Sequence, residues 1–581
     1  MKKHDFLPTT KEELIERNWD QLDIIFIYGD SYIDSPYNGV ALLGKLLEEK
    51  GFKVGIIAQP DWQNLDDIKR LGEPKLFWGV SSGCVDSMVA NYTALKKWRK
   101  KDDFTPGGTN DRRPDRAVIT YTNLIKMAFK NTAPIILGGI EASLRRISHY
   151  DFWSNKVRKS ILFDAKADAL VYGMGEHACL EIAEKLRDGL DYKDTRGICY
   201  IGKEVPEKYL TLPSHQEILE DKQAFLKAFG TFYKNIDPLN AKGLAQLQDN
   251  RYLIQNRPAA HLTQQEFDHL HELNYQNDQH PYYEAKGPAK ALETIRFSLN
   301  SQRGCYGECN FCAITVHQGR TIQWRSEASL VDEAKKFTEH EKWKGIISDV
   351  GGATANMYGY ECDKKLTKGV CKSKNCVFPT KCSLLEPDHS SQIKLLKELR
   401  EVEGVKKVFV ASGLRYDLVL QDKTHGAEYL EELVKHHVSG QLKIAPEHTE
   451  DKVLTHLGKP NNGQMMEFCD MFNEFSEKHN KNQFLTYYFI AAHPGCEKED
   501  MATVKQYATN ELKINPEQVQ IFTPTPLTWS SAMYYTELDK TGNKVFVEKD
   551  PRKKQEQKDV LVNKTFKQFK SKSKFGQRAR Y

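Results

Sequence analysis

Short β-branched apolar runs alternate with amphipathic stretches along the first two hundred positions of the chain. Two of these stretches, GVALLGKLLEEKG and EHACLEIAEKLRDG, have the period of helices. The runs that predict strands are LDIIFIYG (22–29), FKVGIIAQ (52–59), KLFWGVSS (75–82), APIILGGI (133–140) and ADALVYG (167–173). This alternation is typical of a doubly wound parallel sheet, so we predict an N-terminal α/β domain over residues 1–204.

The pattern loosens over residues 205–290, which we interpret as an interdomain segment, and a second alternating series then begins. Amphipathic helical stretches follow its strand candidates. These candidates are IRFSLNS (295–301), GIISDV (345–350), KKVFVAS (406–412), QLKIA (441–445), FLTYYFI (484–490) and QVQIFT (518–523). Six strands with intervening helices predict a partial (β/α)6 barrel over residues 291–548.

Unusual residues follow each strand of the predicted barrel. Barrel enzymes build their sites at the carboxyl ends of the strands, so six such loops at one edge indicate one active site. In chain order the loops hold Cys305-x3-Cys309-x2-Cys312, Gly351-Gly352, Ser412 to Arg415, Pro446-Glu447-His448, His493-Pro494-Gly495 and Thr523 to Pro526.

The three cysteines of one short loop, residues 304–313 (the triplet loop), suggest a metal centre with a vacant position. Three thiolates can hold three irons of a cubane cluster and leave the fourth iron free to chelate a methionine-type ligand. An electron from such a cluster can cleave the sulfonium of that ligand and release a carbon radical. Phe311, before the third cysteine, would pack near the adenine of the ligand. Zinc held by three cysteines and a histidine or water is the alternative.

The CxxxCxxC loop with its aromatic residue resembles the signature of radical S-adenosylmethionine (SAM) enzymes. Longer strings are similar to the YgiQ family of radical SAM proteins along nearly the whole chain. Those strings are GDSYIDSPYNGVALLGKLLEEKGFKVGIIAQPDW, GGIEASLRRISHYDFW, VGGATANMYG, APEHTEDKVLTHLGKP and PTPLTWSSAMYYT. The resemblance implies the fold and a [4Fe-4S] cluster with SAM, but it does not imply a substrate.

The resemblance also assigns residues to roles. Cys305, Cys309 and Cys312 would hold the cluster, and the bare backbone of Gly351 and Gly352 would admit the amino group of SAM. An acidic residue often follows this glycine pair in the superfamily, whereas Ala353 stands here. Ser412 and Arg415 could bind the carboxylate or ribose of SAM, or be strand-end structure. The candidates for substrate contact or proton transfer are Glu447, His448 and His493.

The N-terminal domain is similar to cobalamin-binding modules that precede some radical enzymes. Those modules supply a histidine to cobalt from an Asp-x-His-x-x-Gly string. The matching frame here, Asp34 to Gly39, has Pro36 where the histidine would stand. Proline has no side-chain donor, so binding of cobalamin would have to proceed without this protein ligand.

A second cysteine group follows the second barrel strand. Its members are Cys362, Cys371, Cys376 and Cys382, at spacings looser than the paired knuckles of structural zinc sites. An auxiliary iron–sulfur cluster, a zinc ion and free thiols remain open for this group. The cysteines that are isolated in sequence are interpreted as core residues; they are Cys84, Cys179, Cys199, Cys469 and Cys496.

Charge is unevenly spread along the 581 residues, whose net charge is only +5. The tail over residues 549–581 holds twelve Lys and Arg against three Asp and Glu, and we predict that it is disordered. Its interleaved phenylalanines fit either a solvated end or an arm for RNA. No apolar run long enough to span a membrane and no secretion signal occurs, which predicts a cytoplasmic protein without a membrane partner.

These observations predict a radical SAM enzyme acting on an unknown substrate, with SAM and an electron donor such as a flavodoxin or ferredoxin as partners. One alternative is a radical SAM enzyme that modifies RNA. The other is a nucleic-acid-binding protein stabilised by zinc or a cluster.

Overall fold

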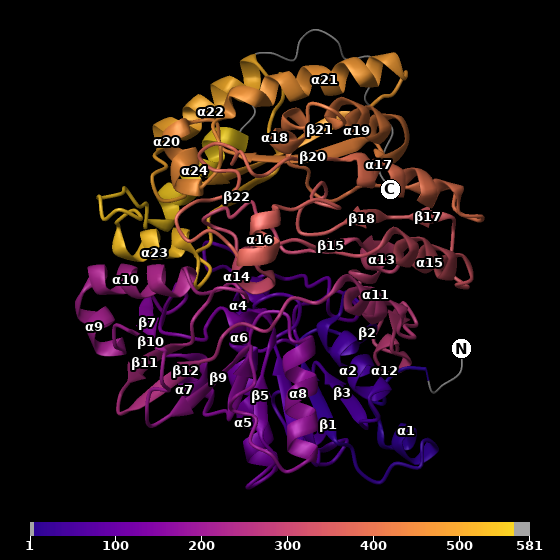
Figure 1. Cartoon of the computed structure of the whole chain (residues 1–581), viewed down its shortest axis with the longest axis vertical. Coiled ribbons are helices and arrows are strands. Elements are labelled where there is room, and N and C mark those ends of the chain that lie inside the picture. Colours follow the sequence, from indigo (N-terminus) through magenta and orange to yellow (C-terminus); the bar gives the residue numbers. More distant parts are fainter. Residues whose placement is uncertain (1–4, 563–581) are drawn as a thin grey trace.

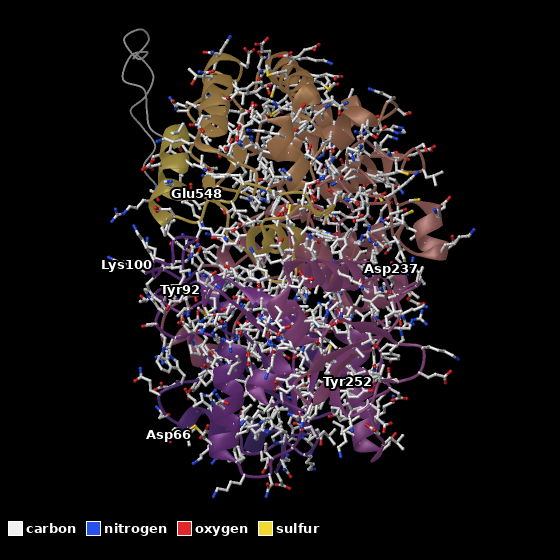
Figure 2. The ribbon with its side chains drawn as sticks, turned by 90° about the vertical axis from the view of Figure 1, so that its left-hand side faces the viewer. Asp66, Tyr92, Lys100, Asp237, Tyr252 and Glu548 are labelled. Atoms are coloured by element: carbon white, nitrogen blue, oxygen red, sulfur yellow. The ribbon has the colours of Figure 1, made fainter. Side chains whose placement is uncertain are left out.

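Two α/β parts lie one above the other along the long axis of the molecule, in a computed structural model that describes residues 5–562 (Figure 1). The lower part, coloured indigo to magenta, is N-terminal, and the upper part ends in orange and yellow. Asp66 and Tyr252 mark the lower part in Figure 2, and Glu548 lies in the upper part.

The N-terminal part is built on a nine-stranded sheet in the order β10-β11-β12-β9-β8-β5-β4-β1-β3. Five of these strands are parallel and correspond to the five predicted runs. They are β1 (Ile24–Tyr28), β3 (Val54–Ala58), β4 (Phe77–Ser81), β5 (Ile135–Leu137) and β8 (Ala169–Val171). The strand order reverses between β1 and β4, which is the switch point where doubly wound sheets bind ligands.

Helices cover both faces of this sheet, so its central strands are buried on both sides. Every residue of β1, β3 and β4 is buried, as expected for β-branched runs in a parallel sheet. Helix α2 (Gly39–Glu49) begins at Asn38, whose side chain accepts from the backbone N–H of Ala41, and α8 (Glu176–Arg187) packs beside it. The predicted doubly wound domain is therefore present.

The segment predicted to be interdomain contributes to the sheet. Its strands β10 (Leu210–Leu212), β11 (Leu244–Gln248) and β12 (Arg251–Gln255) join the sheet through β9 (Ile198–Gly202), which is antiparallel to β8. Helices α9 (His215–Glu220), α10 (Lys222–Tyr233) and α11 (Gln264–Glu272) connect and flank them. The segment is thus continuous with the sheet of the N-terminal part, while the boundaries 1–204, 205–290, 291–548 and 549–581 stay predictions.

The C-terminal part contains all six predicted strands in parallel pairings, and together they form a partial barrel. The strands are β14 (Ser298–Asn300), β17 with β18 (Ile346–Ile347 and Asp349–Gly351), β19 (Lys407–Val408), β20 (Gln441–Glu447), β21 (Phe484–Ala491) and β22 (Val519–Ile521). The helices between them are α15 (Glu327–Thr338), α17 (Ser390–Glu401), α19 (Gly426–Glu432), α21 (Met465–Lys478) and α22 (Lys498–Asn510). Their apolar faces form one core with the strands.

The first part of the tail predicted to be disordered is instead a helix, α24 (Pro551–Val562), which packs on α22 and β22. Leu561 is buried in the barrel core, and the side-chain amide of Gln557 bonds to the backbone of Ala492 and Cys496. These contacts explain why a segment of low apolar content is ordered here. The rest of the tail, residues 563–581, lies outside the described residues.

Within residues 5–562, no helix is long and apolar enough to cross a membrane.

Candidate functional site

The triplet loop leaves the carboxyl edge of β14 and ends at helix α14 (Ile314–Gln318). Gly304 begins it with a φ of +84°, and a Cβ atom there would lie 2.2 Å from the backbone oxygen of Thr321, so only glycine fits. The backbone N–H of Asn310 donates to Leu457 O at 2.8 Å, and its side chain donates to His456 O at 2.9 Å. The loop is therefore fixed to α20 (Asp451–Leu457), the helix that follows β20.

The three thiols of the triplet loop influence one another. Burial raises the pKa of Cys312 to about 12, and the neighbouring Cys309 and Cys305 add to the rise. Burial also raises the pKa of Cys309, while the positive charges of Lys459 and Arg415 oppose the rise. Ionised thiolates in this loop therefore require a positive partner, and a bound metal centre would supply one.

The spacing of the three sulfur atoms bears on which metal they fit. Zinc–sulfur bonds are about 2.3 Å long, so the thiolates on one zinc ion lie about 4 Å apart. The sulfur atoms of Cys305, Cys309 and Cys312 do not all lie within 4.8 Å of one another. Each thiolate of a cubane cluster binds a different iron, so its ligands are held farther apart. Within residues 5–562, the triplet is therefore not among the groups with mononuclear spacing.

Gly351 and Gly352 end β18 next to the triplet loop. A Cβ atom at Gly352 would lie 2.4 Å from the backbone oxygen of Gln302, and one at Gly351 would lie 3.1 Å from Ser412 Oγ. The hydroxyl of Ser412 donates to the carboxylate of Asp349, which also accepts from the backbone N–H of Ala411 and Ser412. The two glycines, Ser412 and Ala353 line one cavity with Asp349, a carboxylate that the sequence motifs did not single out.

Arg415 and Glu447 lie buried near the triplet loop. Arg415 forms a two-bond ion pair with Asp417, at 2.6 and 3.1 Å, and its Nη1 would lie 2.8 Å from a Cβ atom on Gly307. Burial opposes the charge of Arg415, but Asp417 and the cysteines raise its pKa. Burial raises the pKa of Glu447 to about 7, against the charges of Lys459 and Arg415. Arg415 thus places a fixed positive charge by the thiols, and Glu447 can hold a proton there.

His448 and His493 are engaged in structural contacts. The Nδ1 atom of His448 accepts from the backbone N–H of Glu450 at 3.0 Å, and its Nε2 lies 3.6 Å from Cys496 Sγ. His493 contacts Ser530 Oγ at 2.6 Å and the backbone oxygen of Pro494 at 2.8 Å. Both side chains are fully buried, and neither lines the cavity. Phe311 is partly buried between the two main cores and does not line the cavity either.

A cavity of about 510 Å³ separates the carboxyl edges of the two sheets. Tyr28 and Cys84 line it from the switch point of the N-terminal sheet, and Gln302, Asp349 and Gly351 line it from the barrel. Arg303 of the barrel pairs with Glu176 of α8 in its wall. His317 of α14 contacts Ser143 Oγ of the N-terminal part at 3.1 Å. Both parts of the chain therefore build this site.

The cobalamin-like frame forms part of the same wall. Pro36 and Tyr37 line the cavity, and Asn38 caps α2. Cys84, predicted to be a core residue, is instead exposed, and its thiol contacts Tyr28 Oη at 3.1 Å. Position 36 thus faces the cavity but offers no ligand atom.

The second cysteine loop, residues 362–385, packs behind the triplet loop. Cys362 is buried at the start of α16 (Asp363–Lys368), and Cys376 and Cys382 pack with Cys305 against the apolar cluster around Tyr306. The backbone N–H of Cys382 donates to Cys376 O at 2.8 Å. No three of its four sulfur atoms all lie within 4.8 Å of one another, so the loop does not have the geometry of a mononuclear zinc site.

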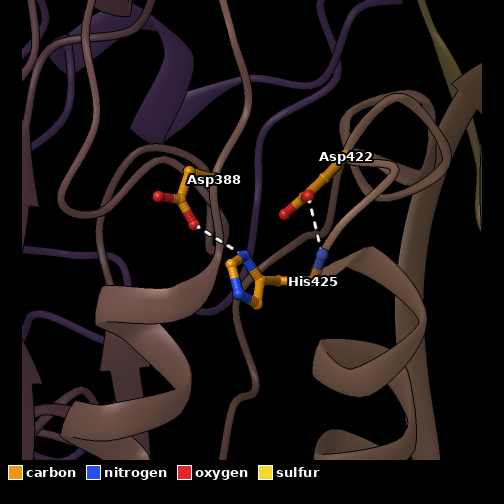
Figure 3. Close-up of side chains that lie close together, drawn as sticks. All are labelled: Asp388, Asp422 and His425. Atoms are coloured by element: carbon orange, nitrogen blue, oxygen red, sulfur yellow. Dashed lines mark hydrogen bonds and ion pairs between the residues drawn. The ribbon is translucent and has the colours of Figure 1, made fainter.

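Asp388, Asp422 and His425 are the one group of three side chains in residues 5–562 that has a mononuclear spacing (Figure 3). The carboxylate of Asp422 already accepts from the backbone N–H of His389, Thr424 and His425, at 2.8 to 3.1 Å. His389 Nδ1 adds a contact at 2.8 Å. Although burial opposes the charge, these bonds lower the pKa of Asp422. The group therefore serves to hydrogen-bond the start of α17 to the start of α19.

Comparison with known proteins gives a family match for the first half of the chain and relatives along nearly all of it. The family model described as Radical SAM N-terminal matches residues 6–298. A UPF0313 protein of Fusobacterium nucleatum is 56% identical over 96% of this chain and 99% of its own length. A UPF0313 protein of Thermotoga neapolitana is 47% identical over 96% of this chain and 98% of its own length.

Two solved structures resemble the fold at low sequence identity. The radical SAM methyltransferase TsrM of Kitasatospora setae, solved with cobalamin and a [4Fe-4S] cluster bound, is 12% identical. Its match covers 87% of this chain and 76% of TsrM, with a TM-score of 0.47. The cobalamin-dependent SAM radical enzyme OxsB is also 12% identical, over 90% of this chain and 57% of OxsB, with a TM-score of 0.49.

Proposed function

The chain belongs to the UPF0313 family, the radical SAM family that its motifs predict, and we propose that it cleaves SAM reductively at a [4Fe-4S] cluster. The single observation that carries the proposal is the triplet loop itself. Its three thiols follow β14 at the carboxyl edge of the barrel, beside the positive charge of Arg415. Gly351 and Gly352, at the same edge, line the cavity between the two parts of the chain. The radical would act on a substrate held in the same cavity.

Cys305, Cys309 and Cys312 would hold the cluster. When bound, a [4Fe-4S] cluster with one iron free of protein ligands supplies the electron that breaks the sulfonium of SAM and gives the 5′-deoxyadenosyl radical. Arg415 and Lys459 contribute positive charge that favours the thiolate forms. A flavodoxin or a ferredoxin is the proposed reductant.

The chain would bind SAM along the edge formed by β18 and β19. Gly351 and Gly352 expose backbone there, and the Asp349 carboxylate holds the hydroxyl of Ser412 at the cavity wall. Asp349 lies two residues before the glycine pair and takes the place of the acidic residue that Ala353 does not supply. Phe311 and Arg415, the other residues predicted to contact SAM, do not line the cavity.

The second cysteine loop would hold a second metal centre of the iron–sulfur kind. Four cysteines within 21 residues, three of them only partly buried, are a high density for free thiols. Their sulfur spacing is wider than a single zinc ion requires. An auxiliary cluster is therefore favoured over zinc.

The test replaces Cys305, Cys309 and Cys312 together by alanine. We expect the loss of about four irons per chain and of 5′-deoxyadenosine formation with dithionite as reductant, because the thiolates hold the cluster. Cys199→Ala is the matched control, since Cys199 is buried in β9 away from the cavity. Unchanged 5′-deoxyadenosine production by the triple variant would refute the proposal, and zinc in place of iron would favour a structural metal site.

A further inference from the structure

The second cysteine loop presents a concentrated positive surface. Residues 364–385 contain six lysines and no Asp or Glu, whereas the chain outside its tail has slightly more acidic than basic residues. Lys364, Lys368, Lys372 and Lys374 are all exposed. Leu366 and Leu384 of the same loop are 45% and 57% exposed. A surface patch of one charge attracts partners of the opposite charge.

This surface lies directly behind the triplet loop. Lys365 Nζ donates to Arg320 O at 2.6 Å and lies 5.1 Å from the centre of the Tyr306 ring. Tyr306 immediately follows Cys305. Arg320 in turn donates to Cys371 O at 3.2 Å and pairs with Glu308 of the triplet loop. Lys365, the neighbour of the exposed Lys364 in the chain, therefore contacts the residue that follows the first cysteine of the triplet.

The loop is also held in place. The backbone N–H of Ile322 donates to Glu361 at 2.9 Å, and Glu361 pairs with the buried Lys365 at 2.8 Å. Asn240, in the segment 205–290 that completes the N-terminal sheet, donates to Val370 O at 2.8 Å. The neighbouring Asp237 is labelled in Figure 2 near the level where the two parts meet. Because hydrogen bonds from both parts of the chain hold the loop, its lysines are in place before a partner binds.

We infer that residues 362–385 are the docking surface for an acidic one-electron carrier protein, which delivers its electron to the centre held by the triplet loop. This inference rests on the proposed function, which needs one electron for each SAM cleaved. The carrier is oxidised by one electron, and that electron breaks the sulfur–C5′ bond of SAM, giving methionine and the 5′-deoxyadenosyl radical. A negative partner meeting four exposed lysines would associate by electrostatic steering.

The composition of the loop favours an acidic protein over RNA. Proteins that bind single strands combine basic residues with exposed aromatic rings on which bases stack. Phe378 is the one aromatic residue in residues 362–385, and it is not exposed. The apolar groups that are exposed are leucines, which suit a protein interface.

The experiment compares the full wild-type chain with Lys364→Glu/Lys368→Glu/Lys372→Glu/Lys374→Glu. The matched control is Lys96→Glu/Lys97→Glu/Lys100→Glu/Lys101→Glu, which reverses four exposed lysines on the N-terminal part. Binding of a flavodoxin and of a ferredoxin is measured at low and high salt, without SAM. In parallel, 5′-deoxyadenosine is measured with each carrier and with dithionite. A second loop variant changes the same four lysines to glutamine, which removes their charge without introducing negative charge, in case the glutamate variant does not fold.

We expect the loop variant to bind the carrier about tenfold more weakly at low salt and to lose most of the salt dependence, while the control binds like the wild type. The carrier-driven rate should fall in parallel, and the dithionite-driven rate should not change. Carrier binding that survives in the loop variant, or is absent in the wild type, overturns the inference. A wild type that dithionite cannot drive to cleave SAM contradicts the proposed function instead.

Discussion

At the scale of single residues, the glycine pair gives a sharp prediction. A Cβ atom at Gly352 would lie 2.4 Å from the backbone oxygen of Gln302, whereas one at Gly413, after β19 at the same edge, meets nothing within 4 Å. Gly352→Ala should therefore lower the free energy of unfolding by about 1–3 kcal/mol and weaken SAM binding, because the backbones at Gly352 and Gln302 must move apart. Gly413→Ala should do neither. Thermal unfolding and equilibrium SAM binding test this, and equal tolerance at both positions would contradict it.

Glu447 gives a prediction about pH. Its pKa in the folded chain, about 7, lies above the ordinary value of 4.5 because the side chain is buried. The folded state therefore holds a proton that the unfolded state releases, and stability falls as the pH rises from about 4.5 to about 7. Above this window the cost of the buried charge is about 3 kcal/mol. Glu447→Gln removes that cost.

The measurement is the melting temperature of Glu447→Gln minus that of the wild type, at pH 5 and at pH 8. The difference should be more positive at pH 8, by a few degrees. Glu499→Gln, at an exposed position of α22, should show no such change with pH. A difference that is the same at both pH values would mean that Glu447 is already ionised in the folded chain at pH 5.

At the scale of elements, the two cysteine loops predict a metal count. If each loop holds a four-iron cluster, the wild type carries about eight irons per chain and the triplet variant about four. Replacing Cys362, Cys371, Cys376 and Cys382 by alanine should likewise leave about four and preserve the triplet centre. Iron and zinc analysis after anaerobic purification measures this. About one zinc with one cluster's iron would identify the second site as structural zinc.

The strands with β-branched runs were predictable because burial on both faces dictates their composition, as in β1 and β3. Strand β10 was not, since Leu210–Leu212 is short and pairs with Leu244 to Gln246, far along the chain. Helix α24 was missed for a similar reason. Its order depends on long-range contacts such as that of Gln557 with Ala492, and composition alone indicated a solvated tail.

At the scale of the whole molecule, the cavity belongs to both parts of the chain. The sequence motifs located only part of its barrel wall, namely Gly351, Gly352 and Ser412, at the edge where loops after parallel strands converge. They did not locate Tyr28, Cys84 or the Arg303–Glu176 pair, whose partners are more than 100 positions apart and carry no local signal. For the same reason the motifs predicted His448 and His493 as substrate contacts, although their side chains contact Cys496 and Ser530, which are distant in the sequence.

A second basic surface connects the tail to the N-terminal part. Residues 96–101, KKWRKK, are exposed, and Trp98 among them is 48% exposed. Lys96 and Lys554 of α24 lie over the same Phe152 ring, at 4.8 and 5.3 Å. Lys100 and Glu548, which precedes α24, lie on the same side of the molecule in Figure 2. Basic residues beside an exposed indole have the composition that binds single-stranded RNA.

The last prediction concerns RNA binding by this surface and the tail. A chain ending at Glu548 would also lose α24 and its buried Leu561, so the truncation should end at Val562. If RNA binds here, two changes should each make the fall of log affinity with log salt less steep, since fewer phosphates are neutralised. They are this truncation and Lys96→Glu/Lys97→Glu/Lys100→Glu/Lys101→Glu. Trp98→Ala should weaken binding with little change in slope. Affinity for bulk RNA is measured from low to high salt, with the four Lys→Glu changes at 364–374 as control. Slopes equal to that of the wild type in all variants would leave the tail a solvated end and remove the main support for an RNA substrate.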